Sequence, residues 1–265
     1  IGYSSFGNCS SLVNIEIPEN VPEVQSWTFM NCTSLENVKL PSNLQQIGYF
    51  AFSNCTSLKN IALPNTLKKI QEGAFSGCKS FEEVIVPTGL SELSDTVFSD
   101  CTSLKVVSMK DNILKIGRAT FYNCPSLEKI DISSEVSEIK NSAFYGCTGL
   151  KTLTLPNKIT NIGNFAFENN TSLKNIVLPE GLETLGRGAF ENCTALQTVT
   201  MPNGVTTIGN RAFAWCESLE NITLPASLET LGARAFFHCE KLKSARLTSA
   251  VESIEPETFA YSGVQ

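Results

Sequence analysis

The stretch Leu58–Cys78 reads LKNIALPNTLKKIQEGAFSGC, and recognisable copies of it recur every 23 residues in both directions. The clearest marker is a phenylalanine followed three residues later by a cysteine. This pair stands at Phe6/Cys9, Phe29/Cys32, Phe52/Cys55, Phe75/Cys78, Phe98/Cys101, Phe121/Cys124, Phe144/Cys147, Phe190/Cys193, Phe213/Cys216 and Phe236/Cys239. Phe167 and Phe259 keep the phase, although Asn170 and Ser262 replace the cysteine. A fixed period without insertions indicates a solenoid.

The apolar residues of one repeat predict a closed coil. Their spacing fits neither a long helix nor a long strand, so we expect them all to point inward. Around Ile61–Leu63 the spacing is two, which predicts a short strand with Asn60 and Ala62 facing outward. Pro64 lacks an N–H group and ends that strand. A second extended piece is expected near residues 67–70, and residues 73–78 are typical of a tight turn or a single helical turn.

The second residue after the phenylalanine predicts an unusual backbone. In most repeats it is asparagine, aspartate or glycine, the residue types that tolerate a left-handed conformation. These positions are Asn8, Asn31, Asn54, Gly77, Asp100, Asn123, Gly146, Asn169 and Asn192. We therefore expect a left-handed residue at this point of every coil.

The repeat resembles a known family. The unit L-x-x-I-x-L-P-x-x-L-x-x-I-G-x-x-A-F-x-x-C, nearly complete at residues 173–193, resembles the BspA-like (Treponema-type) leucine-rich repeats of bacterial and some protozoan surface proteins. The resemblance implies a leucine-rich-repeat solenoid: a right-handed superhelix of 23-residue coils. It implies a parallel β-sheet on one side, turns and short helical turns on the other, and little α-helix. It also implies an extracellular or cell-surface location and a role in adhesion or in binding a host or matrix protein.

Length and composition set further limits. The unbroken period predicts a single array over residues 1–265 of about eleven coils. Both ends fall in mid-repeat, so we expect the array to be part of a longer protein whose export signal and anchor lie elsewhere. No run of 18 apolar residues suggests a membrane span. The net charge is −6 with both signs interspersed, which argues against a nucleic-acid partner.

The sequence predicts no catalytic residue, no metal site and no cofactor. The ten cysteines share one inward column, so we interpret them as buried free thiols that fill space. His238 is the only histidine, it stands in the surface-turn slot, and no acidic partner for it can be named. No zinc-protease, C-x-x-C or P-loop motif is present.

The outward strand residues are the first candidate binding surface, since repeats keep the core fixed and vary the exterior. This surface comprises Ile85, Val106, Ser108, Asp131, Thr154, Val177 and Thr200. Exposed β-branched residues in it favour contact with a protein. The alternative is that they are the isolated exposed apolar residues that most proteins carry. A flat threonine run, Thr152, Thr154, Thr198, Thr200 and Thr223, raises a weaker possibility: ordering of water, as in ice-binding solenoids.

An aromatic edge is the second candidate. Trp215, His238 and Tyr261 replace asparagine or glycine in three successive repeats, and Phe237 lies beside them. Such rings could bind a sugar or a protein loop, which makes a carbohydrate-binding module the alternative function. The other interpretation is that they only shield the edge of the coils. Arg187, Arg211 and Arg234 are close in phase and predict a small basic spot.

Overall fold

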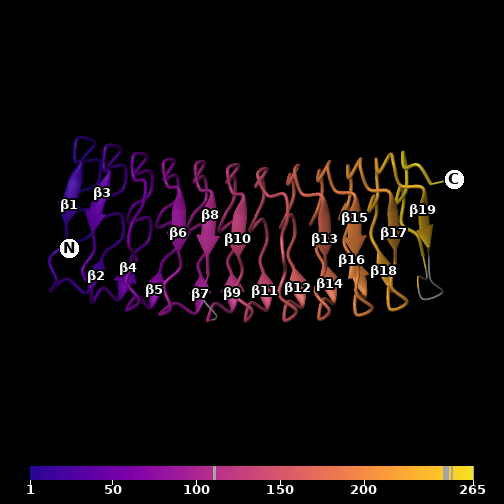
Figure 1. Cartoon of the computed structure of the whole chain (residues 1–265), viewed down its shortest axis with the longest axis horizontal. Coiled ribbons are helices and arrows are strands. Elements are labelled where there is room, and N and C mark those ends of the chain that lie inside the picture. The colour runs from indigo at the N-terminus through magenta and orange to yellow at the C-terminus, as the bar shows by residue number, and fades with distance from the viewer. Residues whose placement is uncertain (110–111, 247–250, 252, 265) are drawn as a thin grey trace. The chain divides into compact units, whose positions relative to one another are not determined.

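A computed structural model describes residues 1–109, 112–246, 251 and 253–264. They group into two compact units, Ile1–Ser133 and Ser134–Gln265. Within each unit, coils of 23 residues are stacked so that equivalent residues of successive coils are paired, and no helix occurs in the described ranges (Figure 1). The predicted leucine-rich-repeat solenoid is confirmed. The single array over both units stays a prediction.

Three-residue strands form one side of the coils. In the first unit they are β1 (Asn14–Glu16), β3 (Asn37–Lys39), β6 (Glu83–Ile85), β8 (Val106–Ser108) and β10 (Lys129–Asp131). In the second unit they are β13 (Asn175–Val177), β15 (Thr198–Thr200), β17 (Asn221–Thr223) and β19 (Ser244–Arg246). They pair in parallel as β1–β3, β6–β8–β10 and β13–β15–β17–β19. The middle residue of each strand points inward and the outer two face solvent, as the alternation predicts.

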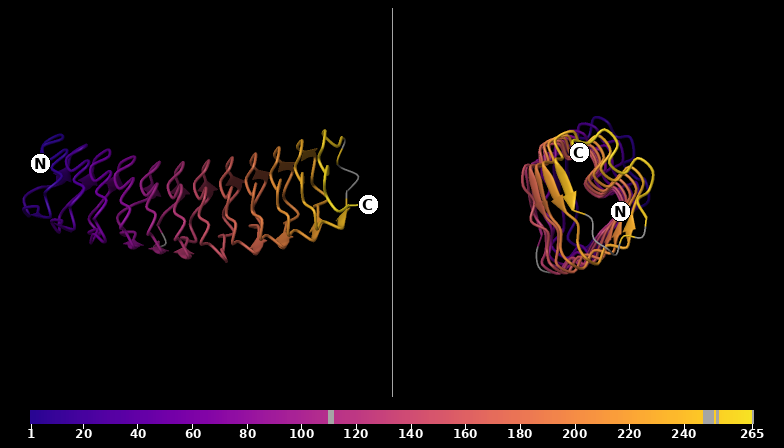
Figure 2. Two further views of the ribbon diagram at one scale, coloured as in Figure 1. Left: turned by 90° about the horizontal axis from the view of Figure 1, so that it is seen from above. Right: turned by 90° about the vertical axis from the view of Figure 1, so that its right-hand side faces the viewer.

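Two-residue strands form a second series. In the first unit they are β2 (Glu23–Val24), β4 (Gln46–Ile47), β5 (Lys69–Ile70), β7 (Glu92–Leu93) and β9 (Lys115–Ile116). In the second unit they are β11 (Glu138–Ile139), β12 (Asn161–Ile162), β14 (Thr184–Leu185), β16 (Thr207–Ile208) and β18 (Thr230–Leu231). In the end-on view of Figure 2, the long and short strands of the second unit lie on different sides of the coil. The extended piece expected near residues 67–70 is therefore β5, and sheet forms on more than one side.

Two predicted strands are absent. Residues 60–62 and 152–154 carry the same alternation as their neighbours, but neither segment is a strand. Ile61 and Leu63 make no backbone hydrogen bond to the coils on either side, and the same holds for Leu153. The prediction of a strand was wrong for this coil, although Asn60 and Ala62 are exposed as predicted. The long sheet of each unit is interrupted there, which leaves β6 and β13 as edge strands.

The phenylalanine column is the core. In the first unit, ring centroids of successive repeats lie 5.1 Å apart for Phe6–Phe29 and 5.7 Å apart for Phe98–Phe121. In the second unit they lie 5.2 Å apart for Phe144–Phe167. The rings from Phe29 to Phe236 that stand in this slot have no exposed surface. Only Phe6 and Phe259, in the first and last repeats, are half-buried.

The turns that hold these rings use two left-handed residues per coil. The predicted one, two residues after the phenylalanine, has a φ of 58° at Asn54 and 62° at Trp215. The second left-handed residue stands two residues before the phenylalanine. It can carry a bulky side chain, as at Phe50, which has a φ of 51°. Alternate N–H groups of the turn then donate to the next coil, as in Phe50 N to Glu72 O at 3.1 Å and Asn54 N to Ser76 O at 2.8 Å. These hydrogen bonds offset the strain of placing ordinary residues at positive φ.

The cysteine column has a polar function as well as a packing one. All ten cysteines are free, and all but Cys9 are buried. Several thiols donate to the carbonyl oxygen of the preceding coil's phenylalanine, for example Cys55 Sγ to Phe29 O at 3.1 Å. Asn170 replaces this bond with one from its amide nitrogen to Phe144 O at 2.8 Å. The interpretation of the cysteines as buried free thiols is confirmed for every cysteine except Cys9.

Candidate interaction surfaces

The outward residues of the first unit lie on β6, β8 and β10. Ile85 is 60% exposed, and its register partners along the sheet are Ser108 and then Asp131. Val106 is half-buried in the neighbouring outward column. Asp131 accepts a hydrogen bond from Ser108 Oγ at 3.4 Å and pairs with Lys129 at 3.4 Å. The predicted residues are therefore neighbours, and the surface changes from apolar at β6 to polar at β10.

A hollow lies beside Ile85, where the strand at residues 60–62 is missing. Its volume is about 390 Å³, and Ile61, Leu63, Asn65, Glu83, Ile85 and Pro87 are among the residues that line it. Aliphatic side chains form much of its wall. It can take an apolar side chain of a partner against the unpaired edge of β6.

The second unit repeats this arrangement. Val177, in the same slot as Ile85 four repeats later, is 63% exposed on the edge strand β13. A hollow of about 440 Å³ lies beside it and is lined by Leu153, Thr154, Leu155, Asn157, Val177 and Pro179, among others. Thr200 is the register partner of Val177, whereas Thr154 lies on the segment that forms no strand. The missing strand also interrupts the flat threonine run at Thr152 and Thr154, so the expected flat array is absent there.

The aromatic edge of the second unit is a compact stack of rings. The Trp215 and His238 rings are 3.9 Å apart and nearly parallel, and Tyr261 continues the stack at 4.6 Å. Phe237 stands at right angles to Tyr261, with 5.4 Å between the ring centroids. Tyr261 is 70% exposed, while the other three are half-buried. The four predicted residues are thus in mutual contact, with one tyrosine presenting the accessible ring.

His238 lies in the surface turn where the sequence places it. Its ring is stacked between the rings of Trp215 and Tyr261. Its Nδ1 is buried without a hydrogen-bond partner, and the Glu240 carboxylate lies 3.8 Å away. An acidic neighbour therefore exists, although sequence reasoning named none. Among the described residues, no serine or cysteine is hydrogen-bonded to this ring.

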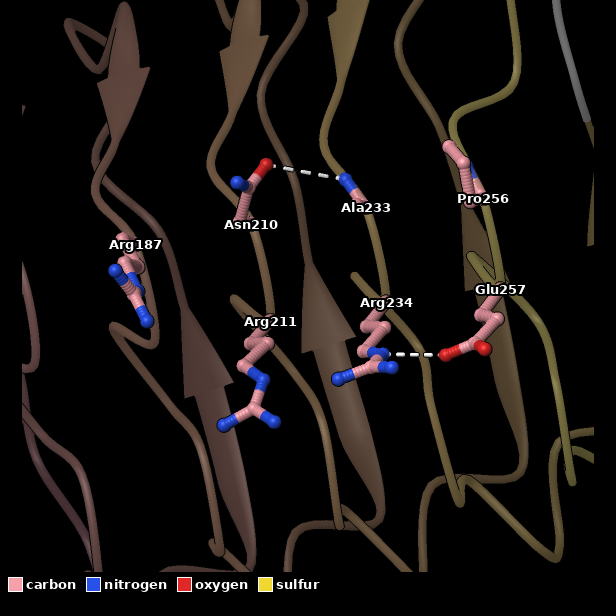
Figure 3. Close-up of a pocket in the computed structure, with 7 residues that line it drawn as sticks. All are labelled: Arg187, Asn210, Arg211, Ala233, Arg234, Pro256 and Glu257. Carbon is pink, nitrogen blue, oxygen red and sulfur yellow. Dashed lines mark hydrogen bonds and ion pairs between the residues drawn. The ribbon is translucent and has the colours of Figure 1, made fainter.

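An arginine pocket adjoins the aromatic edge in the second unit (Figure 3). Arg187, Arg211 and Arg234 contribute guanidinium groups from three successive coils, and the hollow between them has a volume of about 320 Å³. Arg211 Nη1 pairs with Glu191 Oε1 at 3.2 Å, and Arg234 pairs with Glu257. The predicted basic spot is present, and it forms a pocket with carboxylates at its border.

Two glutamates, Glu168 and Glu191, interact with each other and with arginines of this pocket. Burial, followed by the negative charge of Glu191, raises the pKa of Glu168 to about 7. Burial also raises the pKa of Glu191, and Arg211 and Arg187 oppose that rise. Sequence reasoning missed the pair because each glutamate looks like an ordinary surface residue. The signal was available, since both occupy the residue directly after the phenylalanine in successive repeats.

The remaining candidate chemistries find no support in the described ranges. Burial raises the pKa of the Cys78, Cys193 and Cys239 thiols to about 12, so these cysteines are not thiolates near neutral pH. No group of three or more His, Cys, Asp or Glu side chains among the described residues could hold a metal ion. The same part of the chain contains no helix with the length and hydropathy of a membrane span.

Comparisons with known proteins agree with the repeat pattern. The profile of the BspA type Leucine rich repeat region matches in six copies, over residues 1–101, 68–197 and 137–265. A search of curated proteins finds no match.

Solved structures include similar solenoids. A leucine-rich repeat protein from Bacteroides ovatus is 27% identical to this chain, with a TM-score of 0.69. The match covers 98% of this chain and 79% of the Bacteroides chain. A leucine rich cell surface protein from Faecalibacterium prausnitzii is 25% identical, with a TM-score of 0.54. The match covers 96% of this chain and 78% of that protein's chain. The pneumococcal vaccine antigen PcpA is 23% identical, with a TM-score of 0.68. The match covers 95% of this chain and 65% of the PcpA chain, and it shows the fold alone.

Proposed function

Because the chain belongs to the BspA-type leucine-rich repeat family, we propose that it is a non-catalytic cell-surface domain that binds a host or matrix protein. Repeat proteins of this family generally serve as protein-binding scaffolds rather than catalysts. The cell-surface protein from Faecalibacterium prausnitzii supports the location. His238, the histidine that such a site would need, has no hydrogen-bonded nucleophile among the described residues.

The observation that carries the proposal is the repeated hollow of the long sheet. Ile85 and Val177 are highly exposed on edge strands, and each stands beside a hollow lined by leucine, proline and asparagine. Protein interfaces concentrate their binding energy in a few apolar anchors that fill such pockets. An extended segment of the partner with apolar side chains fits each hollow, and the polar residues nearby, such as Asn65 and Asn157, form the rim.

A binding assay on a set of purified extracellular-matrix proteins tests the proposal. We expect at least one to bind the wild-type chain, and the double variant Ile85→Asp, Val177→Asp to weaken binding by about tenfold or more because two anchors become charged. Thr223→Asp is the control, since Thr223 is exposed in the same outward column but adjoins neither hollow. Absence of binding to every matrix protein, or an equal loss in Thr223→Asp, contradicts the proposal.

A second candidate function is carbohydrate binding at the aromatic edge. Its support is the exposed Tyr261 ring on the Trp215–His238 stack, because an apolar flat face with a polar rim suits a sugar ring. A glycan array would show binding that is lost in Tyr261→Ala. Tyr3→Ala is the matched control, since Tyr3 is a 65% exposed tyrosine of the first unit that also contacts a tryptophan. An array on which no glycan binds excludes this candidate.

A further inference from the structure

The arginine pocket of the second unit has one cationic group that forms no direct ion pair with a described carboxylate. Arg211 is paired with Glu191, and Arg234 with Glu257. Arg187 is exposed, and no carboxylate among the described residues lies within ion-pair distance of its guanidinium, which instead lies over the Phe165 ring at 5.5 Å. Glu168 and Glu191 offset part of this positive charge without contacting it directly. Arg187 still presents an exposed guanidinium group on a chain whose net charge is −6.

The geometry of the pocket suits an oxyanion. Figure 3 shows Arg187, Arg211 and Arg234 on successive coils around the pocket, with Arg234 next to Glu257. A planar guanidinium binds carboxylate and sulfate groups through two parallel N–H donors. The hollow of about 320 Å³ is open to solvent and large enough for one such group with part of the molecule that bears it.

The pocket is continuous with the aromatic edge. The guanidinium carbon of Arg234 lies 5.4 Å from the centre of the Phe237 ring, and Phe237 contacts Tyr261. A ligand that places an anionic group between Arg187 and Arg211 can therefore extend across Arg234 toward the exposed aromatic ring. The ligand that combines both features is a saccharide with an acidic substituent.

We infer that this region of the second unit binds an acidic saccharide, with its carboxylate or sulfate at Arg187 and Arg211 and a neighbouring sugar ring at Phe237 and Tyr261. The inference rests on the second candidate function above and names its ligand class. Arg187 provides the charge that the ligand neutralises. Arg211 already forms an ion pair with Glu191, which offsets its charge. Its role is therefore to orient the anionic group through N–H donors.

Binding measurements with three matched oligosaccharides test this inference: one neutral, one with a uronic acid and one with a sulfate. We expect an acidic form to bind at least about tenfold more tightly than the neutral one at low salt, with the difference shrinking as salt is added. The better of the two acidic forms identifies the anion. Arg187→Gln should remove most of this preference, measured as the ratio of the affinities for the acidic and the neutral form.

Arg118→Gln is the control, because Arg118 occupies the same slot in the first unit but is paired with Asp95 at 3.5 Å. Thermal unfolding of both variants checks that they fold. Equal affinity for neutral and acidic forms, with loss of both in Tyr261→Ala, overturns the arginine inference while the carbohydrate function stands. Absence of binding to all three forms overturns both. An equal effect of Arg118→Gln and Arg187→Gln overturns the assignment to this pocket.

Discussion

The same turn position has opposite surface chemistry in two regions of the molecule. In the first unit, Asn8, Asn31 and Asn54 have φ values of 64°, 60° and 58°. Their amides form a ladder, with Asn31 Nδ2 donating to Asn8 Oδ1 at 2.9 Å. In the second unit, Trp215, His238 and Tyr261 have φ values of 62°, 55° and 57° and form a stack of rings.

The comparison shows that the backbone of this turn does not depend on the side chain it carries. Asn54 N donates to the next coil at 2.8 Å, and Trp215 N does the same at 2.7 Å. Behind both stands a fully buried phenylalanine, Phe52 or Phe213. The core and the inter-coil hydrogen bonds hold the conformation, so the side chain at the surface is free to serve recognition.

The largest expected effect comes from removing that common core in each region. Phe52→Ala and Phe213→Ala should each lower the free energy of unfolding by about 3–5 kcal/mol, because each leaves a cavity in a closely packed column. The two losses should be similar despite the different surfaces above them. Urea unfolding followed by circular dichroism gives both values.

Tyr261→Ala, which truncates an exposed ring, is the control for these two variants. It should change stability by less than about 1 kcal/mol. A loss in Phe213→Ala much larger than in Phe52→Ala would mean that the aromatic stack, and not the core, holds the second region.

A smaller effect is expected where one interior column changes chemistry. Asn170 stands in the cysteine slot, and its Oδ1 is buried without a hydrogen-bond partner. Asn170→Cys should raise the free energy of unfolding by about 1–3 kcal/mol, because it removes an unsatisfied polar atom and keeps the thiol bond seen in other coils. Cys193→Asn, the reverse change one repeat later, should lower it. Equal effects of the same sign would contradict this account.

The repeated core was predictable because its side chains recur at a fixed interval. Phe75 and Cys78 mark an inward column, and Asn54 or Gly77 marks a left-handed residue, since only a few residue types favour that conformation. The second left-handed position was not predictable. It is held by residues such as Phe50 and Arg211, and the inter-coil hydrogen bonds impose it rather than the side chain.

The surfaces were less accessible to sequence reasoning. Exposure of Ile85 and Val177 followed from the strand alternation, but the hollows beside them did not, since residues 60–62 and 152–154 resemble their strand-forming counterparts. No residue in either segment distinguishes it from the coils whose strands pair. The ring stack could be predicted because Trp215, His238 and Tyr261 recur at one repeat position. The ion pairs of Arg211 and Arg234 could not be predicted, since their glutamate partners are identified only by the structure.

Exchanging the surface chemistry of the turn should have a still smaller effect on stability. Trp215→Asn loses ring stacking of about 0.5–1.5 kcal/mol, but asparagine tolerates positive φ better and can pair with Asn192 of the preceding repeat. We expect a net change within about 1 kcal/mol, measured by urea unfolding. A loss of several kcal/mol would show that the aromatic stack is structural, and would weaken the case that this edge exists for binding.

The smallest expected effect is a loss of stability with rising pH that arises in the second region. The pKa of Glu168 is raised to about 7, chiefly by burial. The folded chain therefore keeps a proton that the unfolded chain releases, so Glu168 makes the fold less stable as the pH rises from about 4.5 to about 7. Glu168→Gln removes this dependence and should be more stable than the wild type at pH 8, by less than about 1 kcal/mol because water reaches this half-buried group.

Urea unfolding midpoints at pH 5 and pH 8 measure this difference in stability, with Glu36→Gln, a change at an exposed glutamate, as the control. If the midpoints of the wild type and Glu168→Gln shift equally with pH, the glutamate pair is not the source, and the two regions differ in side chains alone.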